Sequence, residues 1–259
     1  MNVRLAAVGD LHCTNASLGV FHPMLEQAAS VADILLLAGD LTDHGLPGEA
    51  RVLVKELTSV HVPIVATLGN HDFESGKTDE LRQILVDAGI TVLDGEAYEG
   101  HGIGIAGVKG FCGGFGPRAL GSWGEDTIKH FVREAVDEAL KLETALARIR
   151  TLPSVALLHY SPVRETVEGE PLEIYPFLGS SRLEEPIDRY RVSLVVHSHA
   201  HHGRVEGKTR AGIPVYNVSM PLLARTFGDA PPFRVLEVPV AEPSSVGGDV
   251  ERRAGDRRR

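Results

Sequence analysis

Short apolar runs alternate with amphipathic segments along most of the chain. Each run is bounded by turn-forming residues, a pattern that predicts a buried strand. We expect strands at residues 3–8, 34–38, 64–66, 103–106, 155–158, 194–196, 215–218 and 235–238. Amphipathic patterns predict helices at residues 23–30, 48–57, 78–88, 126–150 and 182–190. Because strands and helices alternate early in the chain, we expect βαβ units there, followed by a more irregular, strand-rich part.

Two of the predicted helices carry further information. Ser181 and Glu184 have the spacing of a capping box for the last helix, in which two side chains satisfy free backbone N–H groups. The helix at residues 126–150 has one continuous apolar stripe, which we expect to pack on the core of its own domain rather than on a second copy of the chain. The stripe consists of Ile128, Val132, Ala135, Ala139, Leu142, Leu146 and Ile149.

Composition limits the class of protein. Of the 259 residues, 43% are hydrophobic and 24% are charged, which is ordinary for a globular chain. We expect one domain over residues 1–241 and a disordered tail at residues 242–259, where apolar residues are almost absent. Two cysteines are too few for a disulfide framework. Since we find neither a membrane-length apolar run nor a secretory core, we expect a cytoplasmic protein with no membrane partner.

The charge of the chain bears on its partners. The formal net charge is −9, and no basic stripe interrupts the acidic body. Such a surface repels the phosphates of nucleic acids, so we do not expect nucleic acid as a partner. A pocket that holds cations can still bind a phosphate group, since a bound cation is the largest local charge in its site.

Side chains of the kinds that bind metals follow five of the predicted strands. The carboxyl ends of buried strands are where open sheets build their sites, because the strands hold these residues rigidly. The metal-binding types of side chain are Asp10 and His12 after residues 3–8, Asp40 after 34–38, Asn70, His71 and Asp72 after 64–66, His159 after 155–158, and His197, His199 and His201 after 194–196.

The spacing and chemistry of these residues favour a metal centre. Asp10 and His12 are two residues apart, as are His199 and His201, so each pair can face one ion from an extended segment. Imidazoles, carboxylates and one amide, without a thiolate, favour Mn, Fe or Zn. Crowding these groups is costly unless a pair of bridged cations compensates it. Each motif alone is typical of a turn, a helix cap or a core histidine, whereas all five in this order are not.

The order Asp-x-His, Gly-Asp, Gly-Asn-His-Asp, His and a final His-x-His resembles the calcineurin-like metallophosphoesterase superfamily. The resemblance extends from residue 3 to about residue 238. It implies an α/β fold: a four-layer αββα sandwich with two mixed β-sheets flanked by helices and a dinuclear metal centre at one edge. The motifs are closest in form to the phosphodiesterases of the cyclic-nucleotide type.

The resemblance also implies metal-binding roles, for two divalent or trivalent transition metal ions (Mn, Fe or Zn). Asp40 would bridge the two ions. The remaining ligands would be Asp10, His12 and His201 for the first ion, and Asn70, His159 and His199 for the second.

Two further roles follow from the resemblance. His71 matches the family's catalytic histidine, which faces the phosphate, and Asp72 would orient its ring. The family usually has glycine where this chain has Ser198. We expect this small residue to fit, and we expect His197 to lie in the core or behind the ligands rather than to bind a metal.

The reaction implied is hydrolysis of a phosphate ester by a hydroxide that bridges the metals and attacks phosphorus. We favour a phosphodiesterase acting on a nucleotide or another small molecule. The first alternative is a phosphomonoesterase acting on a nucleotide, a phosphoprotein or a sugar phosphate. A nuclease is disfavoured by the acidic body, and a non-catalytic metal-binding scaffold is disfavoured by the presence of His71. A homo-oligomer is compatible with the sequence.

The glycine-rich segment at residues 107–124 is a candidate for substrate contact. It follows a predicted strand and contains Lys109, Arg118 and Trp123, which suit a phosphate or a base. A surface connection with a packed tryptophan is an equal alternative.

Overall fold

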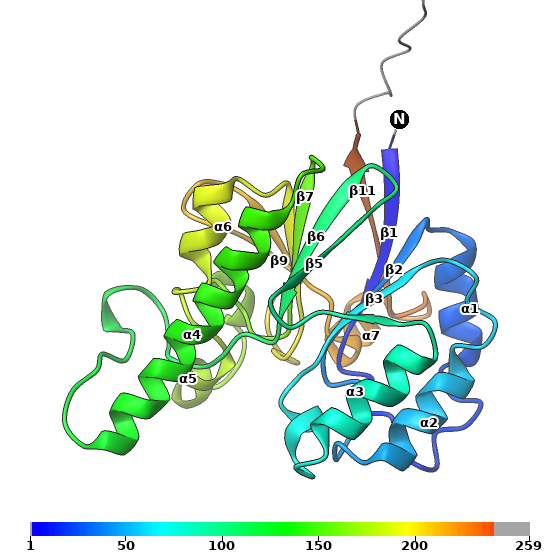
Figure 1. Cartoon of the computed structure of the whole chain (residues 1–259), viewed down its shortest axis with the longest axis horizontal. Coiled ribbons are helices and arrows are strands. Elements are labelled where there is room, and N and C mark those ends of the chain that lie inside the picture. The colour runs from blue at the N-terminus through cyan, green and yellow to red at the C-terminus, as the bar shows by residue number, and fades with distance from the viewer. Residues whose placement is uncertain (1, 241–259) are drawn as a thin grey trace, which may run out of the picture.

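The computed structural model describes residues 2–240 and confirms the expected four-layer αββα sandwich (Figure 1). Two mixed β-sheets lie against each other in the middle of the molecule, and helices cover the outer face of each sheet. The tail expected at residues 242–259 lies outside the described residues.

The first sheet has five strands in the order β11–β1–β2–β3–β4. Its central strands are parallel, and only β11 runs antiparallel, beside β1. Parallel neighbours end at the same edge of a sheet, so the segments that follow β1, β2 and β3 are brought together. The strands are β1 (Asn2–Val8), β2 (Ile34–Ala38), β3 (Ile64–Thr67), β4 (Thr91–Val92) and β11 (Arg234–Pro239).

The second sheet has six strands in the order β5–β6–β7–β8–β10–β9. Its four inner strands are parallel, whereas β5 and β9 are antiparallel edge strands. Because β7 and β8 are neighbours, the segments that follow them also lie together. The strands are β5 (Glu96–Gly100), β6 (Ile103–Val108), β7 (Ser154–Leu158), β8 (Leu194–His197), β9 (Glu206–Lys208) and β10 (Pro214–Asn217).

The helices form the outer layers (Figure 1). The five-stranded sheet is covered by α1 (His22–Ser30), α2 (Pro47–Glu56) and α3 (Thr78–Asp87), and the six-stranded sheet by α4 (Asp126–Arg148) and α6 (Glu184–Tyr190). The connections contain α5 (Tyr175–Leu178), α7 (Met220–Phe227) and the 3₁₀ turns η1 (His71–Phe73), η2 (Gly116–Arg118), η3 (Glu165–Val167) and η4 (Leu172–Ile174). Among residues 2–240, none of these helices combines the length and apolarity that crossing a bilayer requires.

Three apolar cores hold the four layers together. Leu25, Leu53 and Leu81 pack helices on the first sheet, and Leu36 and Leu157 are buried between the two sheets. The third core lies between the second sheet and α4, and it includes Ala139, Leu142, Leu146 and Ile149 of the apolar stripe of that helix. This part of the stripe therefore packs on the core of its own domain, as the sequence predicts.

Several short elements differ from the sequence prediction. Strands β4, β5 and β9 and helices α5 and α7 were not predicted, because short or half-exposed elements leave no continuous apolar run. The capping box at Ser181 and Glu184 is wrong. Helix α6 begins at Glu184, the Ser181 hydroxyl accepts a hydrogen bond from Gly116 N, and the Glu184 carboxylate contacts Arg210.

Candidate metal centre

All seven predicted metal ligands lie together, at the edge where the carboxyl ends of the strands of both sheets meet. The five-stranded sheet contributes the residues after β1, β2 and β3, and the six-stranded sheet contributes those after β7 and β8. In sequence order they are Asp10, His12, Asp40, Asn70, His159, His199 and His201.

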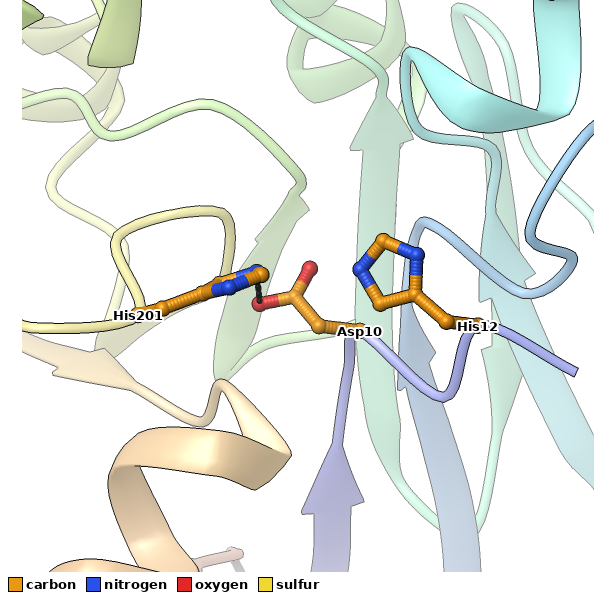
Figure 2. A group of neighbouring side chains, drawn as sticks. All are labelled: Asp10, His12 and His201. Carbon is orange, nitrogen blue, oxygen red and sulfur yellow. Dashed lines mark ion pairs between the residues drawn. The ribbon is translucent and has the colours of Figure 1, made fainter.

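The first group of neighbouring side chains is Asp10, His12 and His201 (Figure 2). Asp10 lies between the two rings, and its Oδ2 is 3.3 Å from His201 Nε2. Both carboxylate oxygens of Asp10 also accept from the backbone N–H of His199, at 2.9 and 3.2 Å. Nε2 of His12 is buried and has no hydrogen-bond partner within residues 2–240. A buried polar atom without a hydrogen-bond partner is energetically unfavourable, which is evidence that a ligand binds to this nitrogen.

The second group is Asp40, His159 and His199, with Asn70 beside it. His159 Nε2 is 2.9 Å from Asn70 Oδ1 and 3.4 Å from Asp40 Oδ2. His199 Nε2 lies 3.2 Å from the carbonyl oxygen of Phe177. A hydrogen bond from Nε2 to this carbonyl leaves Nδ1 of His199 as the nitrogen that can bind an ion.

Asp40 lies between the two groups. Its Oδ2 is 3.9 Å from His12 Nε2 and 3.4 Å from His159 Nε2, so a single oxygen atom faces both. Its Oδ1 accepts a hydrogen bond of 2.8 Å from the backbone N–H of His71, which fixes the orientation of the carboxylate. This is the position that a carboxylate shared by two ions would occupy.

The backbone of the site is strained. Six non-glycine residues between 2 and 240 have a positive φ, and four of them are predicted ligands: Asp10 (56°), His12 (45°), Asp40 (46°) and His199 (68°). Left-handed backbone costs a non-glycine residue about 1–3 kcal/mol, and it persists mainly at functional sites. The concentration of strain at these residues is evidence for function that is independent of their side-chain chemistry.

Two glycines allow the strand ends to approach each other. A Cβ atom on Gly39, whose φ is 80°, would lie 2.6 Å from His159 Nδ1. A Cβ on Gly69 would lie 2.1 Å from Asp40 Oδ1. Any larger residue at either position would push a predicted ligand out of place.

Burial and neighbouring charges shift the ionisation of these groups. Burial, with the nearby charges of Asp10 and Asp72, raises the pKa of Asp40 well above its ordinary value. Burial alone would also raise the pKa of Asp10, but the hydrogen bond from His201 and the neighbouring imidazoles hold it below its ordinary value. Burial lowers the pKa of His199 to about 4 and that of His159 well below its ordinary value. Both imidazoles are therefore neutral near pH 7 and keep a lone pair for a metal.

These observations fit a pair of transition metal ions. The donors are imidazole nitrogens and carboxylate or amide oxygens, which suit Mn, Fe or Zn. The unpaired Nε2 of His12 and the crowded carboxylate of Asp40 are both compensated when a cation lies beside them.

His71 lies beside the first ligand group. Its ring packs edge-on against that of His12 with 4.5 Å between centroids, and its side chain is 32% exposed. The ring Nδ1 is 2.7 Å from the carbonyl oxygen of Asp43. A hydrogen bond to that carbonyl orients the ring and leaves Nε2 free.

The structure corrects the role expected for Asp72. Its buried carboxylate does not orient His71. Instead it accepts hydrogen bonds from Gly69 N (2.8 Å), from Thr42 N (2.9 Å) and Oγ1 (2.6 Å), and from Leu41 N (3.2 Å). Asp72 thereby ties the loop after β2 to the loop after β3.

Asp43 is a residue that the sequence analysis missed. Its carbonyl oxygen contacts the His71 ring, and its Oδ1 lies 3.3 Å from His12 Nδ1. One residue thus orients two of the predicted site histidines. The available signal was its position three residues after Asp40, in the same loop.

His197 lies in the interior, as the sequence predicts. It has no exposed surface, its Nδ1 is 2.8 Å from Ser198 O, and its Nε2 is 2.8 Å from Thr166 Oγ1.

The glycine-rich segment reaches the site indirectly. Gly113 N donates to Pro176 O (2.7 Å), and the neighbouring Phe177 carbonyl contacts His199. Trp123 is 63% exposed, which contradicts the alternative of a packed tryptophan. Lys109 Nζ lies over three aromatic rings, 4.9 to 5.4 Å from their centroids.

Comparison with known families agrees with this site. The family described as calcineurin-like phosphoesterase (Metallophos) matches residues 3–203, which is more than half of the chain and includes every predicted ligand. No curated protein sequence matches the chain.

Solved structures show the same fold. Phosphopantetheinyl hydrolase (PptH) from Mycobacterium tuberculosis is 16% identical with a TM-score of 0.66, over 94% of this chain and 98% of that one. The protein TT1561 from Thermus thermophilus is 15% identical with a TM-score of 0.52, over 86% and 92%. A putative 5′-nucleotidase from Staphylococcus aureus is 16% identical with a TM-score of 0.50, over 84% and 48%. At this level of identity the likeness extends to the fold alone.

Proposed function

Because this chain belongs to the calcineurin-like phosphoesterase family, and is therefore a metal-dependent phosphoesterase, we propose that it is a phosphodiesterase with a two-metal centre. Its substrate would be a nucleotide or another small molecule. The observation that carries the proposal is the carboxylate of Asp40, one oxygen of which faces an imidazole of each ligand group. Such an arrangement favours two ions that share one ligand over a single ion.

The ligands divide between the two ions as the two groups suggest. Asp10, His12 and His201 would hold one ion, Asn70, His159 and His199 the other, and Asp40 both. When bound, two such ions activate water as a nucleophile and neutralise the charge of the phosphoryl oxygens. The donor set supports Mn, Fe or Zn as the resident metals.

His71 is the residue we assign to proton transfer. Asp43 O fixes the ring through Nδ1, so Nε2 is the nitrogen that can meet a substrate at the exposed side of the site. When the ring carries a proton on each nitrogen, the Nε2 proton can pass to the leaving oxygen as the ester bond breaks; the ring is then neutral with its proton on Nδ1, and the transfer is worth about 10²–10⁴-fold in rate. Asn70 can also donate through its amide N–H₂ to a phosphoryl oxygen while its Oδ1 faces the second group.

Other features support a small-molecule substrate in a reducing compartment. Both cysteines are free thiols buried in the protein, which agrees with the proposed cytoplasmic location. The acidic net charge continues to disfavour a nuclease.

A substrate panel on the metal-depleted enzyme reconstituted with Mn²⁺ tests the proposal. It compares a chromogenic phosphodiester with the matching monoester, adds cyclic and linear nucleotides, and includes a phosphopantetheinyl ester because of the similar structure described above. Turnover of diesters supports the proposal, whereas turnover of monoesters alone would favour the phosphomonoesterase. Turnover of neither ester by the metal-loaded protein would favour the non-catalytic scaffold.

A further inference from the structure

Ser198 is a buried side chain at the centre of the site that the proposed mechanism does not use. It has no exposed surface and stands at the position where the sequence analysis expected only a small residue in place of glycine. Its hydroxyl donates to the carbonyl oxygen of Ala38, at the end of β2, and lies 3.0 Å from His159 Nδ1, just after β7. One hydroxyl therefore connects three strand ends, since Ser198 itself follows β8.

The same hydrogen bonds favour a proton on Nδ1 of His159. Ala38 O lies 3.1 Å from His159 Nδ1, and a carbonyl oxygen can only accept. If Nδ1 were bare, its lone pair would face the lone pairs of this buried carbonyl. With the proton on Nδ1, the ring donates to Ala38 O and to Ser198 Oγ, while the serine donates its own proton to Ala38 O.

The other ring nitrogen of His159 then has no proton. Nε2 faces two oxygen donors, Asn70 Oδ1 at 2.9 Å and Asp40 Oδ2 at 3.4 Å. A bare nitrogen between two oxygens repels them in the absence of a cation and completes a ligand set in its presence. The tautomer favoured by Ser198 is thus the tautomer that metal binding requires.

The surrounding chain is built to make room for the serine. A Cβ atom on Gly9 would lie 2.6 Å from Ser198 Cβ and 2.7 Å from its Oγ. Gly9 is the last residue before Asp10, so the serine packs beside the backbone of the first ligand group as well as against His159 of the second. A glycine at position 198 would leave this space empty.

We infer that Ser198 is a positioning residue for the ion at Asn70, His159 and His199: its hydroxyl holds the His159 ring with Nδ1 protonated and Nε2 free to bind. This inference rests on the proposed function, because it concerns one of the two ions proposed there. It assigns to this chain a ligand-orienting hydroxyl that a glycine cannot supply.

Calorimetric titration of the metal-free protein with Mn²⁺ tests the inference directly. We expect two ions to bind to the wild-type protein, and Ser198→Ala to weaken one of them by about tenfold, since loss of a ligand-orienting partner costs about 10–100-fold in metal affinity and Ala38 O remains. The other ion should keep its affinity. Ser198→Gly, which matches the usual family residue, should behave in the same way and serves if the alanine variant does not fold.

A matched control and a spectroscopic measurement separate orientation from simple packing. Ser154 is also a buried serine, at the start of β7 and so at the opposite end of that strand, and Ser154→Ala should leave both affinities unchanged. In the metal-free wild-type protein, the ¹⁵N spectrum of the His159 ring should show a protonated Nδ1 and a bare Nε2, and Ser198→Ala should reduce that preference.

Two results would overturn the inference. One is an unchanged affinity for both ions in Ser198→Ala and Ser198→Gly, and the other is a bare Nδ1 in the metal-free wild-type protein. Failure of the wild-type protein to bind any Mn²⁺ would instead contradict the proposed function, and the tautomer of His159 would still be decided by the ¹⁵N spectrum.

Discussion

The two sheets contribute different chemistry to the same site. The five-stranded sheet supplies both carboxylates, the amide of Asn70 and one imidazole, His12. The six-stranded sheet supplies imidazoles alone, from His159, His199 and His201. The strain is also uneven, since three of the four ligands with a positive φ belong to the five-stranded half.

This difference explains why the halves depend on each other. The acidic half accumulates negative charge, so burial and mutual repulsion raise the pKa of Asp40. In the imidazole half, burial lowers the pKa of His159 and of His199, whereas the hydrogen bond with Asp10 raises the pKa of His201. Neither half alone would offer two ions both the negative charge and the number of donor atoms that the complete site offers.

The largest effect should come from the carboxylate between the halves. Asp40→Asn keeps the size of the side chain but removes the charge that both groups share. We expect turnover to fall by at least about 10³-fold and the number of bound ions to fall from two to one. Steady-state kinetics and metal analysis measure both, with the exposed Asp87→Asn on α3 as the control. Two ions bound to Asp40→Asn with full affinity would show that Asp40 is not shared.

A smaller kinetic effect should come from the five-stranded half without a change in metal binding. His71→Ala removes the proton donor but none of the proposed ligands. We expect turnover of substrates with poor leaving groups to fall about 10²-fold, with metal content unchanged. His130, which is exposed on α4, gives the control His130→Ala. Normal turnover in His71→Ala would remove the role assigned to this histidine.

The six-stranded half should make stability depend on pH. Burial lowers the pKa of His197 to about 4, whereas an unfolded histidine titrates near 6.5. Between these values the unfolded chain binds more protons, so the free energy of unfolding should decrease as the pH falls from about 6.5 to about 4. This residue alone accounts for roughly 3 kcal/mol. Denaturant unfolding of the metal-free protein should show a weaker pH dependence in His197→Gln than in the wild type, and an equal dependence would contradict the prediction.

A tight contact between the halves should give the smallest effect. Gly9→Ala places a Cβ atom against Ser198 and should cost about 1–3 kcal/mol of stability. Ser198→Gly should recover part of that loss in the double variant, because the two side chains would then no longer collide. Gly121→Ala is the control, since its Cβ would meet nothing closer than 3.9 Å. Strictly additive effects would show that Gly9 and Ser198 do not compete for this space.

The sequence predicts the inner strands well, for a physical reason. Strands such as β2 and β7 are buried on both faces and therefore appear as continuous apolar runs. Edge strands such as β5 are half exposed and leave no such run. Helix α7 was not predicted for a different reason. It begins at Met220, only three residues after β10 ends at Asn217, and it includes Pro221.

The identity of the site residues could also be predicted, but not all of their contacts. Strand ends fix where Asp10, Asp40 and His159 lie, so residue type and position in the chain were sufficient. Partners such as those of Asp72 depend on the path of the loops, which sequence spacing does not determine. The tautomer of His159 likewise depends on Ser198, a residue that is distant in sequence.

Crystals grown with Mn²⁺ and measured at an anomalous wavelength test the central claim most directly. The account predicts two Mn peaks roughly 3.5–4 Å apart, one beside His12 and His201 and one beside His159 and His199, with the Asp40 carboxylate between them. A single peak, or peaks away from Asp40, would contradict it.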